Sequence, residues 1–91
     1  MIKLGGSIML EGFDSMEPAK LVVAKKLIGL CAKKTSETMG TLDFFNVLLE
    51  GNNVKVSTKA GEKSSEAFAE AENFFMALSR ALSEIETKAK A

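Results

Sequence analysis

The apolar stripe near the end of the chain limits the fold more than any other feature. Residues 73–88 begin with Asn73, a residue type that caps helix N-termini, and continue with apolar side chains at helical spacing. The spacing is i, i+3, i+4, i+7, i+8 and i+11, at Phe74, Ala77, Leu78, Ala81, Leu82 and Ile85. A helix with one apolar stripe is stable only when another layer covers that stripe, so the rest of the chain must supply a surface.

A second amphipathic helix is predicted in the first half of the chain. Asp14 and Ser15 are suitable N-caps, and Pro18 is tolerated in a first turn. At about 100° per residue, one broad apolar face holds Leu21, Val23, Ala24, Leu27, Ile28, Leu30, Cys31 and Ala32. The Ser-, Thr- and Gly-rich residues 35–41 then read as a connection, so we expect the helix to end before them.

Three segments with strand character lie around and after this helix. Residues 7–13 alternate between the two sides of a short first strand. Residues 42–49 are dense in strand formers, with imperfect alternation between Phe45 and Leu48 that is typical of a bulge. Residues 51–53 carry a turn signal and residues 54–59 alternate cleanly, which predicts a hairpin before the turn at Ala60 and Gly61.

Residues 65–72 carry two conflicting signals. Their alanine and glutamate content favours one long helix from about Ser65, whereas Glu66, Phe68 and Glu70 alternate with alanines as in a strand. We choose a fourth strand, followed by a helix from Asn73 to about Lys88, because Asn73 is a suitable cap for a new helix.

The element order is therefore β-α-β-β-β-α, an α+β fold. Both helices need cover for an apolar stripe, and an antiparallel-rich sheet with two helices packed on one face provides it. At 91 residues there is room for one core, so we expect a single domain over residues 1–91, with residues 1–6 and 88–91 flexible.

The composition argues against catalysis. Histidine is absent, which removes the commonest general base and metal ligand, and the one cysteine cannot form an internal disulfide or a structural zinc site. We expect no catalytic residue, no metal and no cofactor. The lone thiol and the lack of a signal peptide or membrane span indicate a soluble cytoplasmic protein.

Charge is balanced in number but not in distribution. Twelve basic and twelve acidic residues give a formal net charge of zero. Residues 18–36 hold five lysines and no acid, at Lys20, Lys25, Lys26, Lys33 and Lys34, whereas residues 62–86 hold six glutamates. Lys25, Lys26 and Lys33 are expected to project together from the side opposite the apolar face, where they can meet successive phosphates of a nucleic acid. A solvated face that only aids solubility is the alternative interpretation.

Two weaker signals occur elsewhere. Residues 2–7 resemble the glycine loop that begins the amino acid kinase family and cradles phosphates, although those kinases need a far larger domain; the alternative is an N-terminal lead outside the fold. The six phenylalanines are read as core packing in preference to base stacking, with Phe13 packing at the turn into the first helix.

Three stretches of the sequence resemble the family of ribosome hibernation-promoting factors and ribosome-associated translation inhibitors. They are residues 8–13 leading into a helix with paired lysines, the hairpin at residues 51–53, and residues 69–86 with their acidic strand end, Asn73 and helix. The resemblance implies a fold similar to the double-stranded RNA-binding domain, lodged in the small ribosomal subunit, where it blocks initiation.

The resemblance also implies which side chains contact phosphate. They are Lys25, Lys26 and Lys33, with peripheral contacts from Lys20, Lys34, Lys55 and Arg80. Two features depart from the family pattern: this chain is neutral overall, and its second helix has only Arg80 as a basic residue before the tail.

We therefore expect a non-enzymatic protein that binds the small ribosomal subunit or another structured RNA and silences translation. The alternative is a small protein-interaction or self-associating domain without affinity for nucleic acid. The expected state is a monomer or a weak homodimer.

Overall fold

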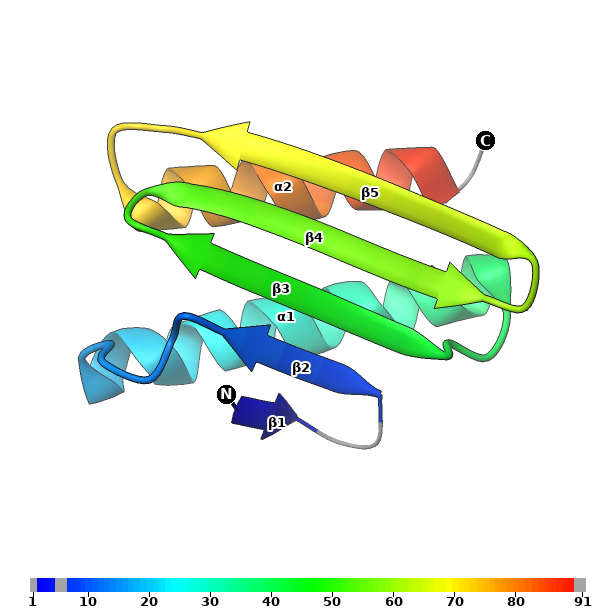
Figure 1. Ribbon diagram of the computed structural model, residues 1–91, viewed down its shortest axis with the longest axis horizontal. Helices are drawn as coiled ribbons and strands as arrows, with labels where there is room; N and C mark the ends of the chain where they lie inside the picture. The colour runs from blue at the N-terminus through cyan, green and yellow to red at the C-terminus, as the bar shows by residue number, and fades with distance from the viewer. Residues whose placement is uncertain (1, 5–6, 90–91) are drawn as a thin grey trace.

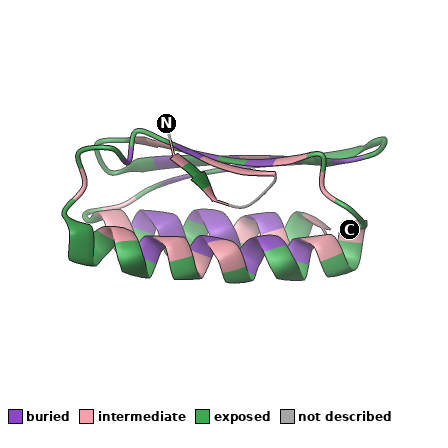
Figure 2. Cartoon of the chain, turned by 90° about the horizontal axis from the view of Figure 1, so that it is seen from below, coloured by how far each residue is buried: buried purple, intermediate pink, exposed green. Residues whose placement is uncertain are grey.

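The computed structural model describes residues 2–4 and 7–89, which form two layers, a sheet and a pair of helices (Figure 1). The strands are β1 (Ile2–Leu4), β2 (Ile8–Glu11), β3 (Phe44–Glu50), β4 (Asn53–Ala60) and β5 (Lys63–Glu70). The helices are α1 (Pro18–Met39) and α2 (Phe74–Ala89), and both lie beneath the same face of the sheet (Figure 2). The predicted α+β class, with two helices on one face, is confirmed.

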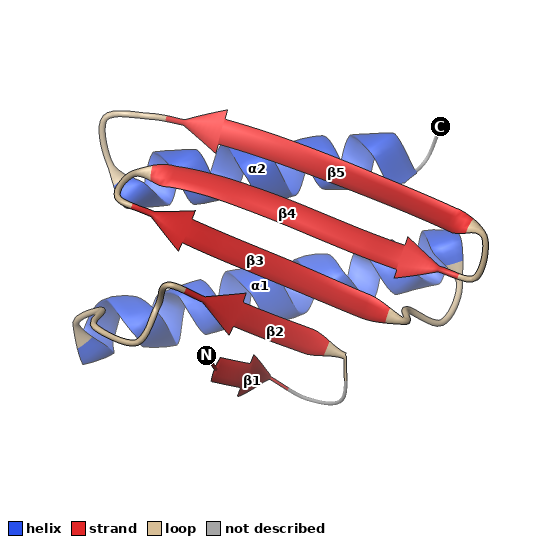
Figure 3. Cartoon of the chain, in the orientation of Figure 1, coloured by secondary structure: helices blue, strands red, loops and turns tan. Residues whose placement is uncertain are grey.

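The strands follow one another across the sheet in chain order, from β1 at one edge to β5 at the other (Figure 3). β2 and β3 are parallel, and the other neighbouring pairs are antiparallel. Parallel neighbours need a crossover connection, and α1 supplies it. The sheet is thus rich in antiparallel pairs, as predicted, with a parallel pair where α1 returns the chain.

The predicted hairpin and the predicted turn after it are both present. Glu50 pairs with Asn53 across a two-residue turn, and Ala60 pairs with Lys63 across the next. The pairing of β3 with β4 continues without a slip from end to end, so the bulge expected between Phe45 and Leu48 is wrong. The alternation is imperfect because Leu48 is an apolar residue on the sheet face away from the helices, and not because the strand is kinked.

The conflict over residues 65–72 is resolved in favour of the strand. β5 buries Ala67 and Ala69 toward the helices and exposes Glu66, Phe68 and Glu70. Alanine suits this strand because α2 crosses close beneath it and a larger side chain would hold the two layers apart. Tertiary packing therefore overrides the helix propensity of the segment.

Asn73 caps α2 as predicted, because its Oδ1 accepts a hydrogen bond from the Met76 backbone N–H at 2.9 Å. Asn73→Ala is expected to lower the free energy of unfolding by about 1 kcal/mol, since that N–H loses its partner. Urea denaturation measures the effect. Asn73→Asp keeps the acceptor and should retain most of the stability; equal losses in both variants would show that the cap does not stabilise α2.

Both ends of α1 differ from the sequence prediction. The helix begins after Glu17, and no side chain caps it, so Asp14 and Ser15 are not the caps. They lie in a turn closed by the Met16 N–H, which donates to the Phe13 carbonyl oxygen at 3.1 Å. This turn carries the chain from the sheet layer down to the helix layer before α1 starts.

At its other end, α1 continues through most of the predicted connection, as far as Met39. Thr35 is buried, and its hydroxyl lies 4.0 Å from the Cys31 sulfur. Ser36 and Thr38 turn their hydroxyls back onto the carbonyl oxygens of Lys33 and Lys34, at 2.9 and 3.2 Å. These hydroxyls bond within the helix itself, so a Ser- and Thr-rich composition does not end it here.

β1 was not predicted as a strand. Ile2, Lys3 and Leu4 pair with Leu10, Met9 and Ile8 of β2, and so residues 2–4 belong to the sheet instead of a flexible lead. The glycine pair of the kinase-like loop, at residues 5–6, lies outside the described residues, as do residues 1 and 90–91. Residues 88–89, expected to be flexible, are the last residues of α2.

The core lies between the sheet and the two helices. Phe13 is fully buried, and its ring meets that of Phe74 edge-to-face with centroids 5.9 Å apart, which confirms its packing role. Phe45 and Val47 of β3 fill the centre above α1 and α2. The one buried hydroxyl on the sheet, that of Thr58, donates to the Phe44 carbonyl oxygen at 2.9 Å.

Candidate nucleic-acid interface

The outer side of α1 carries the best-placed pair of predicted contacts. The helix turns Ala24, Ile28 and Cys31 into the core, so Lys26 and Lys33 lie on the opposite side. Seven residues separate them, which is two helical turns or about 10 Å along the axis. Both side chains are exposed, and within the described part of the chain no ion pair neutralises either ammonium group.

The other lysines of α1 point in different directions. Lys25 is half-buried and lies about 100° around the helix from Lys26. Lys34 lies on the flank next to α2, where its Nζ is 3.8 Å from Glu86 Oε1. Lys20 is exposed in the first turn of the helix. The structure therefore brings Lys26 and Lys33 together and spreads the remaining three around the helix.

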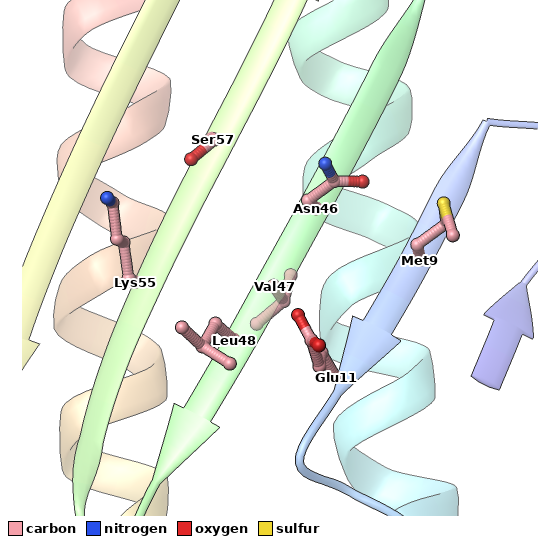
Figure 4. A pocket seen from close by; sticks show the side chains of 7 residues that line it. All are labelled: Met9, Glu11, Asn46, Val47, Leu48, Lys55 and Ser57. Carbon is pink, nitrogen blue, oxygen red and sulfur yellow. The ribbon is translucent and has the colours of Figure 1, made fainter. Parts of the chain in front are cut away.

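Lys55 and Arg80 are remote from this pair. Lys55 lies on the sheet face that the helices leave bare, beside Leu48 and Ser57 (Figure 4). Arg80 lies on the flank of α2 that faces β5, and its Nη1 donates to the Glu70 carbonyl oxygen at 3.4 Å. Lys55 and Arg80 are therefore not part of the surface that Lys26 and Lys33 form.

Glu37 is a neighbour of the lysine pair that sequence reasoning missed. The prediction ended the helix before residue 35, whereas the real helix continues and places Glu37 one turn beyond Lys33 on the same side. The signal was present in the sequence, since Glu37 follows Lys33 at spacing i+4. A carboxylate here lowers the positive potential at one end of the pair.

Aliphatic side chains share the outer side of α1 with the lysines. Val22, Val23 and Leu30 are 56%, 46% and 59% exposed. The sequence pattern placed Val23 and Leu30 on the buried face, which is wrong. α1 is covered by the sheet on one side and by α2 along one flank only, so a narrower stripe is buried than the sequence pattern indicated.

A shallow groove of about 200 Å³ runs between the helices, lined by Leu27, Leu30, Cys31 and Leu82 among others. Burial, with a smaller contribution from the negative charge of Glu86, raises the pKa of the Cys31 thiol to about 11. The thiol is therefore protonated at neutral pH and is not poised as a nucleophile. The thiol donates a hydrogen bond to the Leu82 carbonyl oxygen at 3.6 Å, which joins the two helices.

The described residues contain no cluster of three or more acidic, cysteine or histidine side chains able to hold a metal ion. Neither helix in this part of the chain combines the length and the apolar character needed to cross a bilayer.

The fold is similar to that of a solved domain. The crystal structure of the Thermus thermophilus Protein Y N-terminal domain superimposes with a TM-score of 0.65 over 91% of this chain and 92% of that chain. Sequence identity is 16%, so the likeness establishes the fold alone. No protein-family model matches the sequence, and no curated protein matches it.

Proposed function

We propose that this chain is a non-enzymatic, ribosome-associated RNA-binding protein of the cytoplasm that silences translation by occupying the small ribosomal subunit. The observation that carries the proposal is the pair Lys26 and Lys33, which are exposed on the outer side of α1 and have no ion pair among the described residues. Two likenesses support it: the sequence resembles ribosome hibernation-promoting factors, and the fold is similar to that of the Thermus thermophilus Protein Y N-terminal domain.

The outer side of α1 suits contact with an RNA backbone. An ammonium group that is already exposed and has no carboxylate partner can bind phosphate without first breaking an ion pair. Val22 and Leu30 beside the lysines can pack on ribose or on base edges, which adds contact area without reading sequence. Recognition therefore depends on the shape of a structured RNA and on the position of its phosphates.

Few charges contribute to the attraction of RNA, and they lie on one part of the surface. The net charge of the whole chain is zero, and Glu37 lies next to the lysine pair. Such a surface does not coat nucleic acid by bulk attraction. The fit of the helix to a preformed site must supply a large share of the affinity.

Cosedimentation with isolated small ribosomal subunits over a salt series tests this proposal. We expect binding with a slope of about −2 in log affinity against log salt, as two phosphate contacts produce. The same series with a double-stranded RNA of the same length as a ribosomal helix shows whether a preformed ribosomal site is needed. Binding that does not weaken as salt rises would count against phosphate contact.

A self-associating domain without affinity for nucleic acid is the second candidate. The observation that favours it is the bare face of the sheet, where Phe68 is 54% exposed. A large exposed aromatic side chain on a flat surface is typical of a contact between proteins.

A further inference from the structure

No element of the described residues covers the sheet face away from the helices (Figure 2). Alternation along each strand shows which side chains lie on this face, because the buried residues of each strand face the helices and their neighbours face the other way. Pairing aligns those side chains in rows across the strands. Of the rows that cross the central strand β3, two carry a charged side chain on both sides of it, and β3 has two strands on each side.

The first row mixes apolar and charged side chains. It runs from Glu11 on β2 through Leu48 on β3 and Lys55 on β4 to Phe68 on β5. Figure 4 shows Glu11, Leu48 and Lys55 on this face, with the strands between them and the helices. Shallow hollows lie on either side of Leu48 and Lys55. The row thus has an acid on one side of β3 and a base on the other.

The second row has the opposite polarity. It runs from Lys3 on β1 through Met9 on β2, Asn46 on β3 and Ser57 on β4 to Glu66 on β5. Its base lies on the β1 side and its acid on the β5 side. Lys3 is as many strands from β3 as Glu66 is, and in the first row Glu11 is as many strands from β3 as Lys55 is.

This arrangement is complementary to itself. When a second copy is rotated by half a turn about an axis parallel to β3, each row faces its own copy in reverse order. Glu11 then faces Lys55 of the second copy, Lys3 faces its Glu66, and Leu48 faces its Leu48. We infer that two copies of this chain associate by stacking their bare sheet faces about such an axis, as in an aligned β-sandwich.

The size of the face indicates a weak dimer. β4 and β5 are about 26 Å long, but β1 and β2 have only three and four residues. With strands about 4.8 Å apart, the flat area is smaller than that of a standard protein interface. The axis also brings Glu50 of the two copies together at the turn end of β3, which opposes association. The dimer should therefore form reversibly and only at high protein concentration.

Charge exchange across the interface tests the inference, with sedimentation equilibrium as the readout. Lys55→Glu places an acid opposite Glu11 twice, once for each symmetric contact, and should weaken the dimer roughly tenfold or more. Glu11→Lys should weaken it to a similar degree. The double variant should restore the wild-type affinity, and an equimolar mixture of the two single variants should form a heterodimer tighter than either homodimer.

Two further variants complete the test. Lys59→Glu is the matched control, because it lies on the same face but the axis places no charged residue opposite it, and it should dimerise like the wild type. Glu50→Gln should strengthen the dimer by removing the repulsion at the turn end. Circular dichroism confirms that each variant is folded, as expected for exposed positions.

A wild-type chain that stays monomeric at millimolar concentration would overturn the inference, as would a double variant that stays as weak as the single variants. The inference does not depend on RNA binding, since Lys26 and Lys33 lie on the opposite layer. Glu11→Lys changes none of the lysines or the arginine that are predicted to contact RNA, so it should not weaken ribosome cosedimentation, and the two proposals can fail separately.

Discussion

Gly12→Ala is expected to destabilise the fold by about 2 to 5 kcal/mol, the sum of a left-handed backbone and an overpacked contact. Gly12 has a φ of +87°, a region that residues with a Cβ rarely adopt. An added Cβ would also overlap the backbone carbonyl oxygen of Leu49 on β3. A backbone atom inside a paired strand cannot move aside as a flexible side chain can, so the strand itself must shift.

Thermal unfolding followed by circular dichroism measures this loss. A domain of this size loses about 4 to 8 °C in Tm per kcal/mol, so the variant should melt at least about 8 °C below the wild type. Gly51→Ala is the matched control, since Gly51 also has a positive φ, of +61°, but has open space around its Cβ position. Gly29→Ala, within α1 and equally unobstructed, should raise stability by about 0.5 to 1 kcal/mol.

If Gly12→Ala and Gly51→Ala lose equal stability, the close approach of Gly12 to β3 contributes nothing. The comparison matters for the interface, because Gly12 lies where the chain leaves β2 for α1. A shift there would move the N-terminal half of α1, and with it Lys26, relative to the sheet.

The double variant Lys26→Glu and Lys33→Glu is expected to lose ribosome binding by roughly a hundredfold or more. Each charge-assisted contact contributes about 1.5 kcal/mol or more, and each glutamate adds repulsion from phosphate. Cosedimentation with small subunits at low salt measures the loss. Both positions are exposed and without ion pairs among the described residues, so the fold should be unaffected.

The matched control reverses the charge of two lysines at the β4–β5 hairpin. Lys59→Glu and Lys63→Glu change the net charge by the same amount, and both residues are exposed near the β4–β5 turn. Binding should remain within a few-fold of the wild type. If both double variants lose affinity equally, bulk charge and not the α1 surface holds the RNA. Adding Lys25→Glu to the first variant should have a smaller effect, because Lys25 is half-buried on the flank.

Much of the fold could be predicted because its signals are local. The clean alternation of residues 54–59, the turn at Gly51 and the cap at Asn73 each specify a conformation within a few residues, and each is present as predicted. The bulge in β3 and the early end of α1 were wrong for a shared reason. Leu48 and the hydroxyl side chains near Thr35 were interpreted by residue type alone. The groups that surround them in the fold, which accommodate them within a strand and a helix, could not be taken into account.

The candidate interface was predictable in part. Spacing alone placed Lys26 and Lys33 on one side of a helix, and they lie there. Spacing could not show that Lys34 has Glu86 as a neighbour, or that the side chain of Arg80 points at an edge strand. Those contacts join residues far apart in the chain, and the pattern along the chain does not indicate which of them meet.

The sequence by itself determined the kind and order of the strands and helices, apart from β1, and the side of α1 that carries its central lysines. These follow from the periods of strand and helix and from caps and turns, whose physics acts over a few residues. Only the tertiary structure decided how much of each helix is covered, that β1 joins the sheet, and that Lys55 lies in a row with Glu11 on the far face. Burial and strand register depend on surfaces that meet only after the chain has folded.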